Sequence, residues 1–342
     1  MRSSYKTVLS YFSQFLPEKI VTNEDLSQMM DTNDAWIRER SGISERRFVE
    51  EPVCTSDIAL KAVDILLKKS GYAPESFDCI IANTLSPDYY FPGIAPTIQN
   101  KLNFPNIPAL DVRVQCSAFV YSVQMADAFI RSGIYKRILL VFADVQSKLL
   151  ELTTAGRNVA VLFADGAAAV VCEAQSCQTA PSCQNQESGV IDSILGSDGT
   201  GTELLLLRSP GTATTGFLNQ HAFEQGDWHP KMDGRAVFKH AVTRMCEVAE
   251  SLLKRNHISP QDLTCLIPHQ ANFRISEFVR EKMGLPVEKV FNNIHLYGNT
   301  TSGTIPICLN EALEQGRIKK GDLILTVAFG AGFTWGGNLI RV

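Results

Sequence analysis

The sequence predicts an α/β protein in which helices cover both faces of layered sheets. Segments with helical periodicity alternate along the chain with short β-branched runs, which is typical of a sheet covered on both sides. Residues 130–144 and 313–330 also share an order of helix end, glycine, basic residues and buried strand. That match indicates an internal duplication, although common βα patterns can also produce it by accident. The 342 residues suffice for two domain-sized halves, and we predict 1–180 and 181–342.

The elements of the first half follow from periodicity and end signals. Residues 55–72 read as a helix that Thr55 or Ser56 can cap, that has one apolar face and that Gly71 ends. The further elements predicted in order are a strand at 77–84, a helix near 94–102, a strand near 109–114, a helix at 117–132 and a strand at 137–143.

The second half repeats the alternation after a segment, 173–189, that is rich in Gln, Ser and Cys and predicts a loop. The elements predicted after it are a helix near 234–256, a strand at 263–268, a helix at 271–283, a strand at 289–292, a helix at 302–315 and a strand at 322–329.

Composition and charge exclude several classes of function. A net charge of −4, from 32 basic and 36 acidic residues, gives no global field for nucleic acid or an anionic membrane. No segment has the roughly 18 apolar residues of a membrane span, and the first residues lack the pattern of a signal peptide. We therefore expect a cytoplasmic protein.

The cysteines predict free thiols rather than disulfides or a metal site. Their count is nine, and an odd number cannot form a closed set of intramolecular disulfides. Cys172, Cys177 and Cys183 lie close together in the sequence, but no CxxC pair or histidine accompanies them.

Cys116 lies where a predicted strand gives way to a predicted helix, in "DVRVQCSAFVYSV" (111–123). A thiol at a helix N-terminus ionises more readily, because unpaired backbone N–H groups and the helix dipole stabilise its charge. A buried cysteine taken alone is more often a small hydrophobe, so an ionised nucleophile and an inert core thiol both stay open at this point.

Two other stretches supply partners for such a nucleophile. In "IPHQANFRI" (267–275), His269 follows a buried strand, and in "HLYGNTTSGTIP" (295–306), Asn299 follows a glycine ahead of a helix. Each residue alone is ordinarily structural, as a hydrogen-bonded polar group or as part of a turn. Together with Cys116 they form a Cys, His and Asn set.

A glycine-rich segment, "AFGAGFTWGG" (328–337), suggests the fourth part of the site. Glycines at 330 and 332 allow close backbone approach, so the N–H of Ala331 could bind an oxyanion together with the N–H of Cys116. The alternative is a hairpin that the glycines make possible.

These motifs resemble the β-ketoacyl-acyl carrier protein synthase III family of the thiolase superfamily. The resemblance is nearly chain-wide and implies a duplicated five-layer αβαβα sandwich with two mixed central sheets, usually dimeric. The stretches that carry it are "DTNDAWIRERSGISERRF" (31–48), the Cys116 segment, "FADGAAAVV" (163–171), "MDGRAVFKHAV" (232–242), "IPHQAN", "YGNT" and "FGAGFTWG".

The resemblance implies a two-step condensation without a cofactor or metal. Cys116 takes an acyl group from acyl-coenzyme A, and malonyl-acyl carrier protein then loses carbon dioxide and attacks the acyl-enzyme. His269 and Asn299 donate hydrogen bonds to the enolate oxygen, and the backbone of Cys116 and Ala331 forms the oxyanion hole. Thiolases have a second cysteine near the C-terminal glycine motif, which this chain lacks, and other ketoacyl synthases have a second histidine at the position of Asn299.

Further roles carry over from the resemblance position by position. Trp36 would stack on adenine, with Thr32 beside it and with Arg40 and Arg157 near the base or phosphates; core packing and solvated surface charges are the alternatives. The remaining implied roles are the pantetheine tunnel (Gly234, Phe238, Ala271 and Asn272), docking of an acidic carrier protein (Lys239 and Arg274) and the acyl pocket (Phe91 across a homodimer, Ala118 and Phe163).

Two departures from the family pattern concern the choice of acyl group. Ala118 stands where the family commonly has glycine, and "GNTTSGT" replaces the usual "GNTSAAS". One small residue near a pocket shifts selectivity between acyl groups by about 1–3 kcal/mol. The chain length and branching of the acyl group that Cys116 accepts therefore stay open. Two alternative functions also remain: an acyltransferase of secondary metabolism with another acceptor, and an inactive subunit of a heterodimer, against which the Cys, His and Asn set argues.

Overall fold

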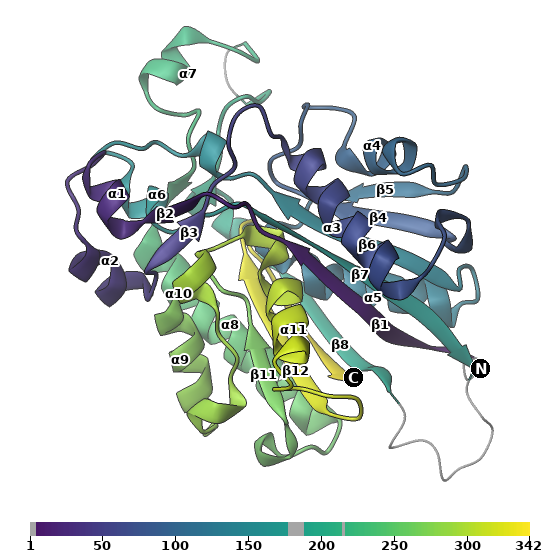
Figure 1. The fold of residues 1–342 in the computed structure, drawn as a ribbon. Coiled ribbons are helices and arrows are strands. Elements are labelled where there is room, and N and C mark those ends of the chain that lie inside the picture. The colour runs from purple at the N-terminus through teal and green to yellow at the C-terminus, as the bar shows by residue number, and fades with distance from the viewer. Residues whose placement is uncertain (1–4, 177–187, 214–215) are drawn as a thin grey trace.

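Two mixed sheets form the framework of the computed structural model, which describes residues 5–176, 188–213 and 216–342 (Figure 1). The first sheet has the strand order β1 (Tyr5–Phe15), β7 (Gly166–Ser176), β6 (Arg137–Asp144), β4 (Cys79–Asn83) and β5 (Ala109–Val112). The second has the order β11 (Cys265–Pro268), β12 (Leu323–Gly330), β13 (Thr334–Arg341) and β8 (Gly189–Ser197).

Helices cover the sheets in three layers, each marked by its own apolar core. Between the sheets, α5 (Ala118–Arg131) and α11 (Thr304–Glu314) pack against strands of both sheets. On the outer face of the first sheet lie α3 (Thr55–Ser70) and α4 (Ile94–Lys101). On the outer face of the second lie α8 (Gly234–Arg255) and α9 (Phe273–Lys282). The αβαβα sandwich predicted from the sequence is confirmed.

The two sheets repeat one topology. In the first sheet β1, β7 and β6 are antiparallel neighbours, and β6 and β4 are parallel. In the second sheet β8, β13 and β12 are antiparallel neighbours, and β12 and β11 are parallel. The position of β5 is taken in the second sheet by a single parallel bridge between Leu266 and Val290. The strand predicted at 289–292 is therefore wrong, because only one residue of that segment pairs.

Short helices and strands connect the layers of the sandwich. They are β2 (Ile20–Thr22), α1 (Asn23–Ser27), α2 (Asp34–Ser41), β3 (Glu45–Arg47), α6 (Arg157–Ala160), β9 (Leu205–Leu206), α7 (Gln220–Glu224), β10 (Lys231–Met232) and α10 (Ile294–Tyr297). Fully buried Arg46 in β3 donates hydrogen bonds to the carbonyl oxygens of Val21 and Val161, which joins the β2–β3 ribbon to the end of α6.

Two local predictions need correction. The first turn of α3 is capped by Cys54 rather than by Thr55 or Ser56, since Asp57 accepts from the Cys54 N–H at 3.0 Å; Gly71 ends the helix as predicted, with a φ of 71°. The loop predicted at 173–189 is wrong at both ends, because β7 continues to Ser176 and β8 begins at Gly189.

The division of the chain at 180 and 181 lies outside the described residues, as do Cys177 and Cys183, and the division stays a prediction.

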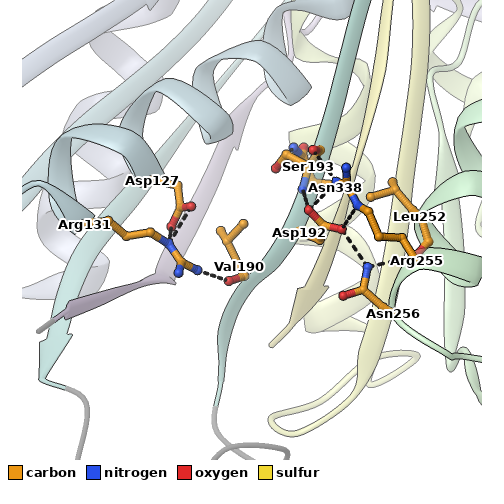
Figure 2. A network of polar contacts seen from close by, with 9 residues as sticks. All are labelled: Asp127, Arg131, Val190, Asp192, Ser193, Leu252, Arg255, Asn256 and Asn338. Atoms are coloured by element: carbon orange, nitrogen blue, oxygen red, sulfur yellow. Dashed lines mark hydrogen bonds and ion pairs between the residues drawn. The ribbon is translucent and has the colours of Figure 1, made fainter. Parts of the chain in front are cut away.

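A polar network fixes the edge strand β8 between α5 and α8 (Figure 2). The carboxylate of Asp192 accepts hydrogen bonds from the guanidinium of Arg255 and from Nδ2 of Asn256. On the other side Arg131 donates to the carbonyl oxygen of Val190 at 2.9 Å. The network holds β8 beside β13, whose first residue contacts the turn that carries Cys116.

In the described part of the chain, no helix is both long and apolar enough to cross a membrane.

Candidate active site

A strained turn presents Cys116. After β5 ends at Val112, Gln115 adopts a positive φ of 49°, a conformation that residues other than glycine rarely take. Cys116 follows, two positions before the first residue of α5. Ser117 then donates from Oγ to the carbonyl oxygen of Thr334 at 2.9 Å. The thiol is therefore held between the start of the central helix α5 and the start of β13.

The resting thiol of Cys116 is neutral, contrary to the expectation from its helical position. Its side chain is almost fully enclosed, with a residue exposure of 8 %. Burial, assisted by the negative charge of Asp144, raises the pKa of Cys116 to about 12. In the resting state, the loss of solvation raises the pKa of the thiol by more than the helix N-terminus lowers it. The N-terminus of α5 can therefore stabilise negative charge only as the sulfur reacts.

His269 extends from the end of β11 and is also uncharged. Its backbone N–H donates to the carbonyl oxygen of Val327 at 2.8 Å, and its Nδ1 lies 2.6 Å from Oγ1 of Thr304. Its Nε2 is buried and has no described hydrogen-bond partner. Burial lowers the pKa of His269 to about 3.

Asn299 is fixed by contacts with both halves of the chain. Its N–H donates to the carbonyl oxygen of Leu162, and its own carbonyl accepts from Ala164, both at 2.9 Å. Its Oδ1 accepts from the backbone N–H of Thr301 at 2.9 Å, which fixes the carboxamide. Its Nδ2 has no partner among the described residues, so this amide remains a hydrogen-bond donor.

A buried carboxylate of the first half holds the turn after Asn299. Asp144, at the end of β6, accepts hydrogen bonds from the N–H and the hydroxyl of Ser302 at 3.0 and 2.5 Å, and from the N–H of Leu85 at 2.7 Å. Burial raises the pKa of Asp144 to about 6. Neither Asp144 nor the role of Ser302 was predicted from the sequence, since the residues lie 158 positions apart.

One cavity brings Cys116, His269 and Asn299 together in its lining. Its lining also contains the residues expected along the tunnel, and Phe163. The tunnel residues are Gly234, Phe238, Ala271 and Asn272, and Gly330 of the glycine-rich segment also lines the cavity. Lining residues that were not predicted from the sequence are Leu162, Leu205, Met232, Val237, Ala241, Met245, Ile275 and Phe329.

Helical spacing could have identified part of that missed lining. Once Gly234 and Phe238 are assigned to one face of α8, the periodicity of a helix places Val237, Ala241 and Met245 on the same face.

A cationic cluster around Trp36 lies beside this cavity. The guanidinium carbons of Arg40 and Arg157 lie 4.7 and 5.3 Å from the centre of the Trp36 ring. Asn272, from the cavity lining, donates from Nδ2 to the carbonyl oxygen of Arg40 at 2.8 Å. Thr32, predicted beside Trp36, has a buried Oγ1 with no described partner.

Comparisons with known proteins identify the family. The family model for 3-oxoacyl-[acyl-carrier-protein] synthase III matches residues 110–199, and the model of its C-terminal part matches 253–342. A β-ketoacyl-[acyl-carrier-protein] synthase III of Chlorobaculum tepidum is 41% identical, with 98% of this chain and 99% of that protein covered. One of Chlorobium luteolum is 39% identical, with 97% and 98% covered. The chain belongs to the 3-oxoacyl-acyl carrier protein synthase III family.

Solved structures agree with that assignment. The synthase III of Aquifex aeolicus has a TM-score of 0.86 and 36% identity, covering 99% of this chain and 100% of its own. That of Pseudomonas aeruginosa has a TM-score of 0.87 and 33% identity, covering 98% of each chain. The resemblance read from the sequence is confirmed, and the protein is a condensing acyltransferase of the thiolase fold.

The other residues carried over from the synthase III family lie in different surroundings. Lys239 and Arg274 are exposed, and the Arg274 guanidinium carbon lies 5.6 Å from the ring centre of Phe238 at the cavity. Ala118 is 1 % exposed and packs in the core between the sheets, outside the cavity lining. Phe91 is 80 % exposed and does not line the cavity of its own chain, so its role across a dimer stays a prediction.

Of the two residues predicted to form the oxyanion hole, Cys116 lines the cavity, whereas Ala331 is not among the lining residues and directly follows Gly330, which is. The backbone N–H groups of Cys116 and Ala331 donate to no other residue in the described ranges. No group of three or more His, Cys, Asp and Glu residues in those ranges could hold a metal ion.

We expect Gly330→Ala to disrupt the site without unfolding the synthase. A Cβ at Gly330 would lie 3.0 Å from both the backbone nitrogen and Cβ of Cys116, so the turn that carries the thiol must shift. A displacement of the reacting atoms costs up to about 100-fold in rate. Steady-state condensation assays check this against Gly199→Ala, where a Cβ would have no neighbour within 4 Å. Equal rates in the two variants would contradict the prediction.

Proposed function

We propose that this synthase starts fatty acid synthesis by joining an acyl group from acyl-coenzyme A to the two-carbon unit of malonyl-acyl carrier protein, with release of carbon dioxide. The observation that carries the proposal is the meeting of Cys116, His269 and Asn299 in one cavity, beside a partly buried cluster of Trp36 and two arginines. The nucleophile comes from the first half of the chain and both hydrogen-bond donors from the second.

The first step is transfer of the acyl group to Cys116. The sulfur attacks the thioester carbon, the bond to the coenzyme A sulfur breaks, and the thiol proton ends on that departing sulfur. The N–H groups of Cys116 and Ala331, which have no described protein acceptor, would hold the negative oxygen of the tetrahedral intermediate. The N-terminus of α5 stabilises the same charge.

The second step is condensation. The malonyl thioester loses its carboxylate as carbon dioxide, and the bonding electron pair stays on the substrate as an enolate. Nδ2 of Asn299 and Nε2 of His269 would stabilise that enolate oxygen, because neither nitrogen is occupied by a described residue. The enolate carbon then attacks the acyl thioester and releases the Cys116 sulfur as a thiolate, which takes a proton from water to restore the resting thiol.

Side chains around the cavity support the proposal that coenzyme A and acyl carrier protein carry the two substrates. Trp36, Arg40 and Arg157 present an aromatic face and two cations suited to adenine and phosphates. Lys239 and Arg274, both exposed near the cavity, offer positive charge to an acidic carrier protein. A homodimer, with Phe91 of each chain completing the other's acyl pocket, is part of the same proposal.

We expect Trp36→Ala to raise the KM for acyl-coenzyme A about tenfold and to leave kcat almost unchanged, because stacking on one base contributes about 1–3 kcal/mol. An acyl-pantetheine lacks the adenine, so its KM should not change. Trp36→Phe keeps an aromatic face and serves as the matched control. A similar rise in KM for both donors would show that Trp36 acts through the fold rather than through adenine.

Mass spectrometry with a series of straight and branched acyl-coenzyme A donors tests the function directly. We expect an acyl adduct on Cys116 and then release of labelled carbon dioxide from malonyl-acyl carrier protein. Acylation without release of carbon dioxide would point to another acceptor, as in secondary metabolism. If none of the donors formed an adduct, the chain would be an inactive subunit.

A further inference from the structure

The hydroxyl of Thr304 contacts the imidazole on which the proposed condensation depends. Thr304 is the first residue of α11 and is 2 % exposed. Its Oγ1 lies 2.6 Å from Nδ1 of His269 and 3.3 Å from the carbonyl oxygen of Thr301. A hydroxyl carries one hydrogen, so it can donate to only one of these acceptors.

The two possible hydrogen bonds of the Thr304 hydroxyl give opposite hydrogen-bonding roles to Nε2, on the far side of the imidazole ring. If the Thr304 hydroxyl donates to Nδ1, the neutral ring carries its proton on Nε2, which is then a donor. If the hydroxyl donates to the Thr301 carbonyl, Nδ1 carries the proton and donates to the hydroxyl oxygen. Nε2 is then only an acceptor.

The two distances distinguish these arrangements. Hydrogen bonds between oxygen atoms span about 2.5–3.0 Å, and those from N–H to oxygen about 2.7–3.2 Å. The contact of 2.6 Å between Nδ1 of His269 and Oγ1 of Thr304 is shorter than the range of an N–H donor to oxygen. The contact of 3.3 Å with Thr301 is long for a hydroxyl donor. The geometry therefore favours donation from Thr304 to Nδ1.

We propose that Thr304 is a positioning residue that holds His269 as its Nε2–H tautomer. Nε2 is then a hydrogen-bond donor, rather than a base, in the cavity that Cys116 also lines. This inference rests on the proposed function, because an enolate oxygen needs a donor. Nε2 has no described partner, and His269 lines the cavity. Nε2–H stabilises the enolate while the carbon dioxide leaves, and it keeps its proton throughout.

The charge state of the ring makes this tautomer decisive. Burial lowers the pKa of His269 to about 3, so the ring has one proton at neutral pH and only its location is open. Thr304 lies 35 residues from His269 in the sequence and is brought to it by the packing of α11 behind β11.

Nitrogen NMR of the free enzyme tests the tautomer without any substrate. The chain has six histidines, and the His269 signals are assigned by their loss in His269→Ala. We expect Nδ1 of the wild type to have the shift of an unprotonated ring nitrogen and Nε2 that of a protonated one. The reverse pattern in the wild type would overturn the proposal.

Kinetics of Thr304→Val and Thr304→Ser test the consequence. Valine has the same shape without the hydroxyl, so we expect a mixed tautomer signal and a kcat for decarboxylation lower by about tenfold, the typical effect of one neutral hydrogen bond. The KM for the malonyl substrate and the rate of Cys116 acylation should change less than about twofold. Serine should restore decarboxylation. The control is Thr7→Val, where the buried hydroxyl has no described partner.

Two kinetic outcomes would overturn the role of Thr304. One is wild-type decarboxylation by Thr304→Val, and the other is an equal loss of acylation and decarboxylation that serine does not restore. Absence of any acyl-enzyme in the wild type would instead overturn the proposed function. The NMR pattern would still decide which tautomer Thr304 holds.

Discussion

Replacement of Cys116 by alanine should abolish the acyl-enzyme and lower the condensation rate by at least about a thousandfold, because the whole covalent route passes through this sulfur. The fold should remain, since alanine fits the space of a thiol at the start of α5. Mass spectrometry after incubation with acyl-coenzyme A measures the adduct, and circular dichroism measures the fold. The decarboxylation of malonyl-acyl carrier protein without a primer should survive in this variant, because the donors Asn299 and His269 are unchanged.

A second buried thiol provides the control for this experiment. Cys172 lies in β7, is fully buried and has a raised pKa for the same reason as Cys116, which is loss of solvation. Cys172→Ala should acylate at the wild-type rate, because Cys172 lines no described cavity. An adduct that persists in Cys116→Ala and disappears in Cys172→Ala would reject Cys116 as the nucleophile.

Strands rich in β-branched residues were the predictable part of the fold. β6 and β12 were recognised because Ile, Leu, Val and Phe make up most of them, with Thr326 the one polar residue inside the run of β12. β7 and β13 were not, because they contain "GAAAVV" and "WGG", and alanine and glycine have low strand propensity. A Cβ at Gly336 would lie 2.7 Å from the carbonyl oxygen of Ile194, so close packing explains the glycine there.

The reacting groups of the site could be predicted from the sequence, but the residues that hold them in place could not. Cys116, His269 and Asn299 each follow a strand or turn visible in the sequence, and the family resemblance joined them. Asp144 and Thr304 hold their partners across 158 and 35 residues of sequence, and no local pattern reveals such contacts. The charge of the thiol was misjudged for a related reason, because the enclosure that raises its pKa comes from the assembled cavity.

His269→Ala should separate the two steps of the reaction. We expect the rate of decarboxylation and condensation to fall by about 100- to 1000-fold, the usual cost of one donor to a developing oxyanion. Acylation of Cys116 should stay within a few-fold of the wild type, because the tetrahedral oxygen of that step is assigned to backbone N–H groups. Single-turnover measurements of adduct formation and of carbon dioxide release compare the steps. An equal loss in both would mean that His269 also takes part in acyl transfer.

The same variant should change how folding stability responds to acid. Burial lowers the pKa of His269 from 6.5 to about 3, so between these values the unfolded chain binds a proton that the folded chain does not. His269 therefore makes the free energy of unfolding fall as the pH drops from 6.5 toward 3. Asp144 acts in the opposite direction, because its pKa rises from 3.8 to about 6 and acid between these values favours the folded state.

Urea unfolding at pH 7 and pH 5 isolates the contribution of His269, because Asp144 is present in both proteins. The loss of stability on acidification should be smaller in His269→Ala than in the wild type. The exposed residue His221 supplies the control, and His221→Ala should lose as much stability as the wild type. If His269→Ala also lost as much, the pKa of His269 would be the same in the folded and unfolded chains, and burial would not be what keeps the ring neutral.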